Sequence, residues 1–190
     1  MTDESYNPWT TLSSKEVYDN KWISVREDQI VNPSGGKGIY GVVHFKSSAV
    51  GIIPLDDDGN TWLVGQYRYA LNEYSWEIPE GGVSFGKDMP EGAKRELREE
   101  AGIIAGDWRD ILHLAVSNSV TDQRAIIYLA RKLSFVRAKP EETEALQIKK
   151  VPFSEAFQMV MDGTITDTMS VAAILKLKIM MDRDEIIERR

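Results

Sequence analysis

The sequence contains no cysteine, which excludes disulfides and thiolate metal sites. It has two histidines, His44 and His113, so a zinc site built from several histidines is not expected. Positive charge is also scarce, because the net charge is −7 and the isoelectric point is about 5.0. A chain this acidic is not expected to bind nucleic acid, since phosphate contacts need a basic patch.

Long hydrophobic runs are missing as well. The most apolar stretch, residues 171–181, is interrupted by Lys176 and Lys178 and is shorter than the roughly 20 residues that cross a bilayer. The first ten residues, MTDESYNPWT, show no basic segment followed by an apolar one, as a signal peptide would. We therefore expect no membrane partner and a cytoplasmic location.

What is present is enough hydrophobic sequence, 42% of 190 residues, for one core with a short N-terminal extension. Residues 1–14 are polar and expected to be loosely held. The turn signal at 56–60 predicts a hairpin that joins two of the expected strands. Strands are predicted at 17–31 around a turn, 39–45, 49–55, 61–69, 111–116, 125–133 and 146–151. With helices at 154–161 and 170–183, this order predicts a mixed sheet between helices, an α/β (α+β) fold.

A third helix is the best defined. Asp88 is a suitable N-cap with Glu91 three residues later, and Gly102 is a natural C-terminal stop. Between them, apolar residues recur every fourth position. They are Met89, Ala93, Leu97 and Ala101.

Two glutamates fall on or beside the apolar stripe of this helix. At roughly 100° per residue, Glu100 lies about 20° from the centre of the stripe and Glu96 about 60°. Buried carboxylates are costly without a partner, and carboxylates four residues apart repel. A divalent cation between them resolves both costs. The alternative is a solvated helix face with an Arg95–Glu99 ion pair, but the glycine-rich turn before the helix favours the metal site.

Residues 81–103 resemble the Nudix box, Gly-x5-Glu-x7-Arg-Glu-aliphatic-x-Glu-Glu-x-Gly-aliphatic. The matching residues are Gly81, Arg95, Glu96, Leu97, Glu99, Glu100, Gly102 and Ile103. Lys87 departs from the pattern, because the family usually has a glutamate there that braces the helix arginine. The resemblance therefore implies a shifted salt-bridge pattern around Arg95, with loss of activity as an alternative.

The resemblance extends over residues 17–177. The segments NKWISV, Pro-x-Gly, LVGQYRY and WEIPEGG are similar to the ADP-ribose and nucleoside-diphosphate-sugar pyrophosphatase branch of the Nudix family. It implies the Nudix α/β/α sandwich at residues 46–190 and an N-terminal β-strand extension at 1–45 that forms a homodimer. It also implies Mg2+, with Mn2+ as a possible substitute.

The same resemblance assigns the catalytic centre. Glu96 and Glu100 would bind the metal with the backbone carbonyl of Glu80, and Glu99 would be a third carboxylate with a catalytic role. An acidic loop would supply Glu142 as the base and Glu144 as a further metal ligand. A solvated loop is the alternative reading of those two residues.

Substrate contacts follow from the resemblance too. Arg68 would clamp a phosphate, although a surface charge at the end of a strand is the alternative. Trp22 and Tyr40 would sandwich the nucleobase, one from each subunit, unless they are ordinary strand aromatics. His44 and Phe45 replace an arginine that some ADP-ribose hydrolases carry, which favours a broader range of nucleotide sugars.

The sequence therefore predicts Mg2+-dependent hydrolysis of a pyrophosphate bond in nucleoside diphosphate sugars such as ADP-ribose or GDP-mannose. The products would be a nucleoside monophosphate and a sugar phosphate. Three alternatives stay open. One is a nucleotide-sugar-binding sensor with weak catalysis, suggested by Lys87, and another is a Nudix nucleoside triphosphate pyrophosphatase. The third, an RNA-decapping Nudix enzyme, would be expected to show a basic channel, which the acidic composition disfavours.

Overall fold

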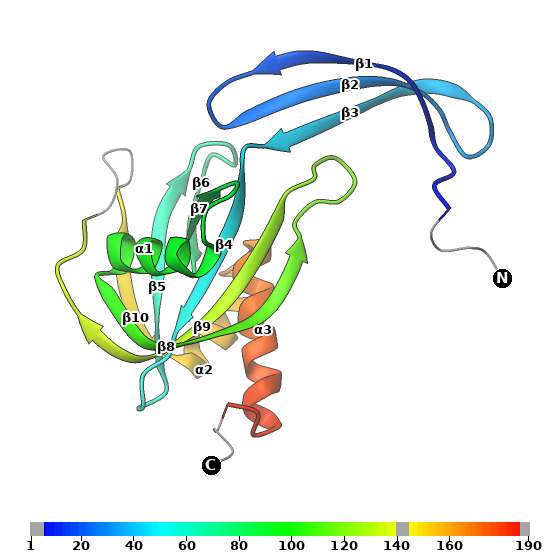
Figure 1. Ribbon diagram of the computed structural model, residues 1–190. Helices are drawn as coiled ribbons and strands as arrows, with labels where there is room; N and C mark the ends of the chain where they lie inside the picture. Colours follow the sequence, from blue (N-terminus) through cyan, green and yellow to red (C-terminus); the bar gives the residue numbers. More distant parts are fainter. Residues whose placement is uncertain (1–5, 140–144, 187–190) are drawn as a thin grey trace. The chain divides into compact units, whose positions relative to one another are not determined.

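The computed structural model describes residues 6–139 and 145–186, and in it the chain forms two compact units (Figure 1). The first comprises the residues up to Ser47 together with Ser117–Gln123. The second comprises Ser48–Val116 and the residues from Arg124 onward. None of the described helices is both long enough and apolar enough to cross a membrane.

The first unit is a three-stranded antiparallel sheet in the order β1-β2-β3. Its strands are β1 (Thr10–Asp19), β2 (Ile23–Val31) and β3 (Lys37–Phe45). The turn predicted within residues 17–31 is confirmed and falls at Asn20, whose side chain accepts hydrogen bonds from the Trp22 and Ile23 amides, both at 2.8 Å. The 117–123 segment joins this unit where Val43 N–H donates to the Val120 carbonyl at 2.8 Å.

The expectation that residues 1–14 are loosely held is wrong for positions 10–14, which begin β1. Every residue of β1 is exposed, and its sequence, TTLSSKEVYD, does not alternate between apolar and polar. The strand forms because its backbone pairs with β2 from Thr10 opposite Val31 to Asp19 opposite Ser24. Hydrophobic periodicity cannot report a strand that buries no face.

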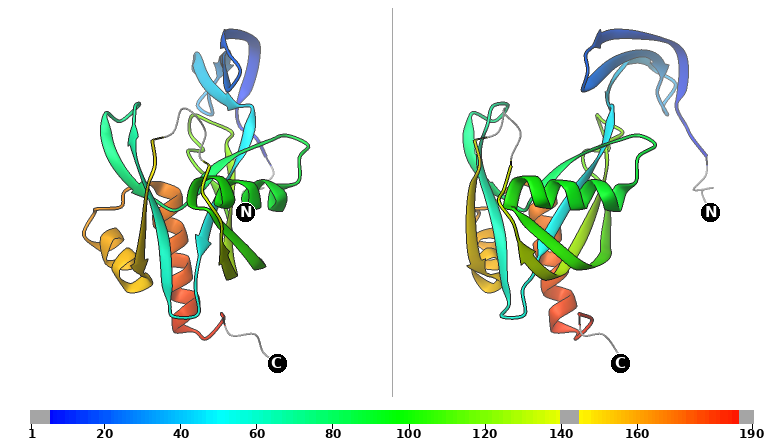
Figure 2. Two further views of the ribbon diagram at one scale, coloured as in Figure 1. Left: turned by 90° about the vertical axis from the view of Figure 1, so that its left-hand side faces the viewer. Right: turned by 60° about the vertical axis from the view of Figure 1, so that its left-hand side comes forward.

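The second unit contains two sheets with helices on both sides (Figure 2). One is antiparallel, in the order β10-β5-β6, and the other is mixed, in the order β7-β4-β9-β8 with β4 parallel to β9. The strands are β4 (Ser47–Pro54), β5 (Asn60–Arg68), β6 (Glu73–Glu77), β7 (Glu80–Ser84), β8 (Ile103–Ala115), β9 (Arg124–Phe135) and β10 (Gln147–Pro152). The predicted α/β/α sandwich with a mixed sheet is confirmed.

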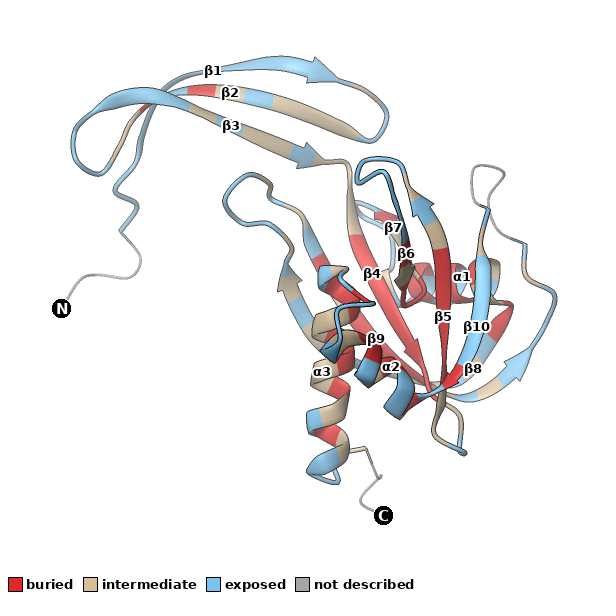
Figure 3. Cartoon of the chain, turned by 180° about the vertical axis from the view of Figure 1, so that it is seen from behind, coloured by how far each residue is buried: buried red, intermediate tan, exposed pale blue. Residues whose placement is uncertain are grey.

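Neighbouring residues of the central strands face opposite sides of the sandwich. Ile52 and Tyr128 belong to a core that includes Leu97 of α1 (Met89–Ala101). The next residue of β4, Ile53, belongs to the other core, which α2 (Phe153–Met161) and α3 (Thr168–Asp182) cover. Figure 3 shows buried residues concentrated in β4 and β5. Among the helices that the structure describes, α1 is thus alone on its side of the sheets.

The turn predicted at 56–60 is confirmed, but the hairpin is not. The Asp56 carboxylate accepts from the Asn60 amide at 2.7 Å and so closes the turn. Beyond it, β4 and β5 share one isolated bridge, Leu55 with Thr61, and then enter different sheets. Most residues of both strands are buried, and each strand finds its backbone partners elsewhere in the sandwich.

The ends of α1 are those predicted from the sequence. Asp88 caps it by accepting from the Glu91 amide at 2.9 Å, and Gly102 ends it at a φ of 65°. β8 then begins at Ile103, eight positions before the predicted strand at 111–116. That early part was missed because it exposes much of its surface and contains small and charged residues. The predicted helices near 154 and 170 are confirmed within two residues at their starts.

Candidate active site

The candidate site begins with two carboxylates on the buried side of α1. Glu100 is 2% exposed and Glu96 is 9% exposed, as their positions beside the apolar stripe predicted. Glu99, one residue before Glu100, is partly exposed. The site therefore has two acidic groups held inside the fold and a third at its edge.

The glycine turn, which forms the start of β7, packs directly against these carboxylates. The Glu80 backbone N–H donates to Glu100 Oε2 at 3.0 Å. A Cβ atom on Gly81 would lie 2.1 Å from the Glu96 carboxyl carbon. Only a residue without a side chain allows this approach, so the turn and the helix form one compact structure.

Arg95 links the same parts. Its guanidinium donates to Glu99 at 2.8 Å, to Glu96 at 2.5 Å and to the Gly82 carbonyl at 3.1 Å. Burial lowers the pKa of Arg95, but the charges of Glu96 and Glu99 outweigh that effect and raise it. Glu99, Glu96 and the Gly82 carbonyl thus position Arg95, although residue 87 is a lysine and not the glutamate that usually braces this arginine.

Arg68, at the end of β5, lies in a second set of carboxylates that the sequence did not reveal. Its Nε donates to Glu77 at 2.8 Å and its Nη2 to Glu80 at 2.6 Å. The hydrogen bond with Glu77 raises the pKa of Arg68 despite burial. Burial, reinforced by the charges of Asp167 and Glu77, raises the pKa of Glu80 well above its usual range.

A pocket of about 470 Å³ opens beside Arg68. Its lining includes Glu77, Glu80 and Asp167. Among residues 6–139 and 145–186, the Arg68 guanidinium donates to Glu77 and Glu80 through Nε and Nη2. The two N–H groups on Nη1 therefore remain for a further acceptor at this pocket.

The donor set fits a hard divalent cation. Glu96 and Glu100 supply carboxylate oxygens, and the Glu80 backbone lies against Glu100. The described residues contain no group of three or more acidic or histidine side chains placed for metal binding. Mg2+ commonly uses one or two carboxylates and keeps several waters, so two buried glutamates suit it. Glu142 and Glu144 lie outside the described residues.

The two aromatic candidates lie far apart along the first unit. The Trp22 carbonyl accepts from the Lys46 amide at 2.9 Å, whereas Tyr40 lies opposite Asp28 in the β2–β3 ladder. Six positions along β3, at about 3.3 Å each, separate the two by roughly 20 Å. A base sandwich needs rings about 7 Å apart, so Trp22 and Tyr40 of one chain cannot form it together.

Tyr40 has partners that the sequence did not indicate. Its hydroxyl donates to the Ser119 carbonyl at 2.6 Å, and its ring lies edge-on to Trp9 with centroids 5.4 Å apart. His44, on the same strand, contacts Asp122 at 2.5 Å. No local signal joins these positions, because they come from three separate segments of the sequence.

A three-layer sandwich with a glycine turn packed against a glutamate-bearing helix defines the class, an α/β/α protein with an acidic site on one helix. A family model described as the NUDIX domain matches residues 46–169. A second, described as the nucleoside diphosphate sugar hydrolase N-terminal domain, matches residues 9–43. The chain belongs to the Nudix hydrolase family and is an enzyme of that family.

Individual proteins of this family are similar to the chain over most of its length. The chain is 34% identical over 170 residues to an ADP-ribose pyrophosphatase of Mycobacterium tuberculosis, an alignment that covers 87% of this chain and 81% of the relative. It is 26% identical to an ADP-ribose pyrophosphatase of Bacillus subtilis, covering 89% and 92%. A crystal structure of an ADP compounds hydrolase superposes with a TM-score of 0.84 at 21% identity, covering 97% of this chain and all of that one, and thus has the same fold.

Proposed function

We propose that this enzyme hydrolyses the pyrophosphate bond of nucleoside diphosphate sugars, ADP-ribose foremost and GDP-mannose or similar compounds as alternatives, in the presence of Mg2+ or Mn2+. The observation that carries the proposal is the pair of buried glutamates, Glu96 and Glu100, against the glycine turn. The substrate class is supported by the match of residues 9–43 to a nucleoside diphosphate sugar hydrolase domain and by the names of the relatives.

In this proposal Glu96, Glu100, Glu144 and the Glu80 carbonyl hold the cation. When bound, the cation neutralises phosphate charge and makes a bound water more acidic. Glu142 accepts the proton of the attacking water, which forms a new bond to one phosphorus as the bond to the bridging oxygen breaks. Glu99, next to the cluster and paired with Arg95, completes the acidic group.

The substrate is held by its phosphates and its base. Arg68 offers Nη1 to a phosphate oxygen at the mouth of its pocket, while Glu77 and Glu80 hold the rest of the guanidinium in place. Trp22 of one subunit and Tyr40 of the other stack on the nucleobase in a homodimer. The roughly 20 Å between these residues within one chain supports this division between subunits.

The remaining parts of the proposal concern the whole chain. Residues 1–45 form the N-terminal β extension that makes the dimer, and residues 46–190 form the hydrolase domain. We place the enzyme in the cytoplasm, with no membrane partner. We expect no nucleic-acid partner, because its net charge of −7 opposes binding to a phosphate backbone.

The test is release of phosphate, with added phosphatase and Mg2+, from a panel of ADP-ribose, GDP-mannose, UDP-glucose, nucleoside triphosphates and capped RNA. Turnover confined to the diphosphate sugars is the expected result. Turnover of triphosphates alone would overturn the substrate class. Tight nucleotide-sugar binding without turnover would instead show a sensor, which the exposed Lys87 at the usual glutamate position makes the second candidate.

A further inference from the structure

One pocket of the second unit lies between the outer face of α1 and the start of β8. It has a volume of about 680 Å³ and is enclosed by α1, the start of β8 and residues 136–139. The α1 residues that line it, such as Lys94 and Arg98, are spaced along one helix face. At roughly 100° per residue, Arg98 points about 140° away from Ala93, the centre of the buried stripe. Glu96 and Glu100 do not line the pocket, although Arg95 and Glu99 do.

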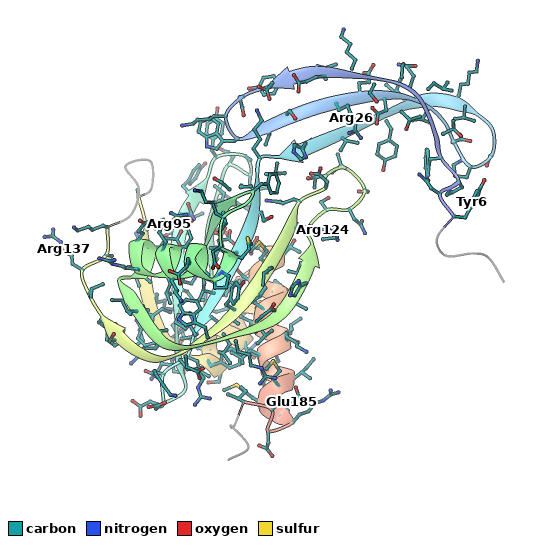
Figure 4. All side chains as sticks on the ribbon, in the orientation of Figure 1. Tyr6, Arg26, Arg95, Arg124, Arg137 and Glu185 are labelled. Carbon is teal, nitrogen blue, oxygen red and sulfur yellow. The ribbon has the colours of Figure 1, made fainter. Side chains whose placement is uncertain are left out.

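Positive charge dominates this pocket. Its lining contains five basic side chains and two acidic ones, a net charge of +3 in a chain whose total is −7. Figure 4 shows two of the basic residues, Arg95 on α1 and Arg137 after β9, on the same side of the unit. A concave surface of one sign raises the local concentration of counter-ions of the other sign. The pocket is thus suited to an anion.

Some of this charge is already neutralised. Lys94 pairs with Glu91 at 2.6 Å, and Arg95 pairs with Glu99. Three further cations, Arg98, Arg137 and Lys139, have no carboxylate of the described residues within ion-pair distance. The two guanidinium groups among them suit the oxygens of a phosphate, which they can bind through two parallel hydrogen bonds.

The other wall of the pocket is apolar. It consists of Trp108, Ile104 and Val136. Trp108 is fixed in place, because its indole N–H donates to the Ala105 carbonyl at 3.0 Å and its ring lies edge-on to Tyr128. Ile104 and Val136 are both more than 40% exposed. A ligand with an apolar or aromatic part would cover this surface while its charged part met the cations.

We propose that this pocket binds an anion that carries a phosphate group next to a planar apolar group, with a nucleoside monophosphate as the chemical class. Arg98, Arg137 and Lys139 hold the phosphate, and the planar group lies on the wall that contains Trp108. Glu96 and Glu100 do not line this pocket, so binding here does not require a metal held between them. It exists whether or not the proposed hydrolysis is correct.

The proposal is tested by calorimetric titration of the full chain with AMP in EDTA, which removes any metal-dependent binding. The wild type and Glu100→Gln are expected to bind AMP equally, because Glu100 does not line this pocket. The double variant Arg98→Ala/Arg137→Ala should bind at least about tenfold more weakly, since it loses two charge-assisted contacts. Inorganic phosphate should bind the same cations more weakly than AMP does, because it has no apolar part.

Lys37→Ala is the matched control, an exposed lysine of β3 outside this pocket, and it should bind AMP as the wild type does. Arg95 is left unchanged because it also contacts Glu96. Equal affinity in the double variant and the wild type would overturn the proposal. So would loss of AMP binding in Glu100→Gln, which would locate the anion at the glutamate pair. Circular dichroism of each variant separates lost binding from lost folding.

Discussion

Gly81 shows how one missing side chain shapes the active site. Its Cβ position is filled by the Glu96 carboxylate, with contacts between 2.1 and 2.5 Å. In Gly81→Ala the methyl group and the carboxylate cannot both keep their places, so Glu96 must shift from its present position. We expect pyrophosphatase activity to fall at least about tenfold, as it does when groups that orient a metal ligand are lost. The measurement is kcat/KM with ADP-ribose and Mg2+.

Gly41→Ala is the control for this change. A Cβ atom at Gly41 meets nothing within 4 Å, so that variant should keep wild-type activity. If Gly81→Ala were as active as Gly41→Ala, the close approach of the turn to Glu96 would have no functional meaning.

Substituting Arg68 should lower the stability of the fold, because Arg68 neutralises a buried charge. The Glu77 side chain is 3% exposed, and Arg68 is its cationic partner. Arg68→Met leaves that carboxylate buried without a counter-charge, which should cost about 3 kcal/mol in the free energy of unfolding. Urea denaturation measures it. Adding Glu77→Gln to the variant should recover most of the loss, whereas Arg124→Met, which removes an exposed arginine, should cost little. No loss in Arg68→Met would show that Glu77 needs no cation.

At the scale of single residues, the sequence predicts those side-chain positions that helical periodicity determines. Glu96 and Glu100 could be located because helical spacing relates them to the apolar stripe on the same helix. The partners of Arg68 could not, because Glu77 and Glu80 are nine and twelve residues away and meet Arg68 only through the pairing of β5 with β6 and the start of β7. Nothing in local sequence encodes such a contact.

Among the elements, the β4–β5 turn has a built-in dependence on pH. Burial raises the pKa of Asp56, but hydrogen bonds from Lys150 and Asn60 outweigh it and bring the pKa to about 2. A folded pKa below the unfolded one adds stability that is complete above about pH 4 and lost as the pH falls through 2. Allowing for solvent screening, Asp56→Asn should lose about 1 kcal/mol at pH 7 and nothing near pH 2.

Thermal unfolding of the wild type and Asp56→Asn between pH 2 and pH 7 checks this. The two curves should converge as the pH falls. Asp58→Asn changes an exposed carboxylate of the same turn and should track the wild type at every pH. A constant difference between Asp56→Asn and the wild type would mean that the carboxylate charge is not what stabilises the turn.

The elements that the sequence predicts best are those with both a start signal and a buried face. α1 has Asp88, Gly102 and an apolar stripe, and its predicted ends are correct. β1 has neither signal and is wholly exposed, so only its end at residues 17–19 was predicted, as the first strand before the turn. The 56–60 turn was correct, yet its strands separate into two sheets, because strand partners depend on the whole sandwich and not on the turn.

On the scale of the whole molecule, the distance between Trp22 and Tyr40 leads to a test of the dimer. Trp22→Ala and Tyr40→Ala should each raise the KM for ADP-ribose about tenfold, because each removes one stacking surface. If the two residues meet across subunits, mixing the variants under subunit exchange creates heterodimers with one intact site. A fraction of the sites should then regain the wild-type KM.

The control mixes Trp22→Ala with the double variant Trp22→Ala/Tyr40→Ala, which cannot build an intact site in any pairing. Recovery in the first mixture alone supports the division between subunits. No recovery in the first mixture, with subunit exchange verified by mass spectrometry, would contradict it. The sequence indicates the aromatic pair by resemblance, but their separation along β3 became visible only in the strand register.

The central claim is that the buried glutamates of α1 hold the catalytic metal, and Mn2+ binding followed by electron paramagnetic resonance tests it most directly. Glu100→Gln should weaken Mn2+ binding more than about tenfold while the protein stays folded. Glu91→Gln, which changes an exposed glutamate of the same helix, should bind as the wild type does. Wild-type Mn2+ affinity in Glu100→Gln would contradict the account, because Glu100 would then not bind the metal.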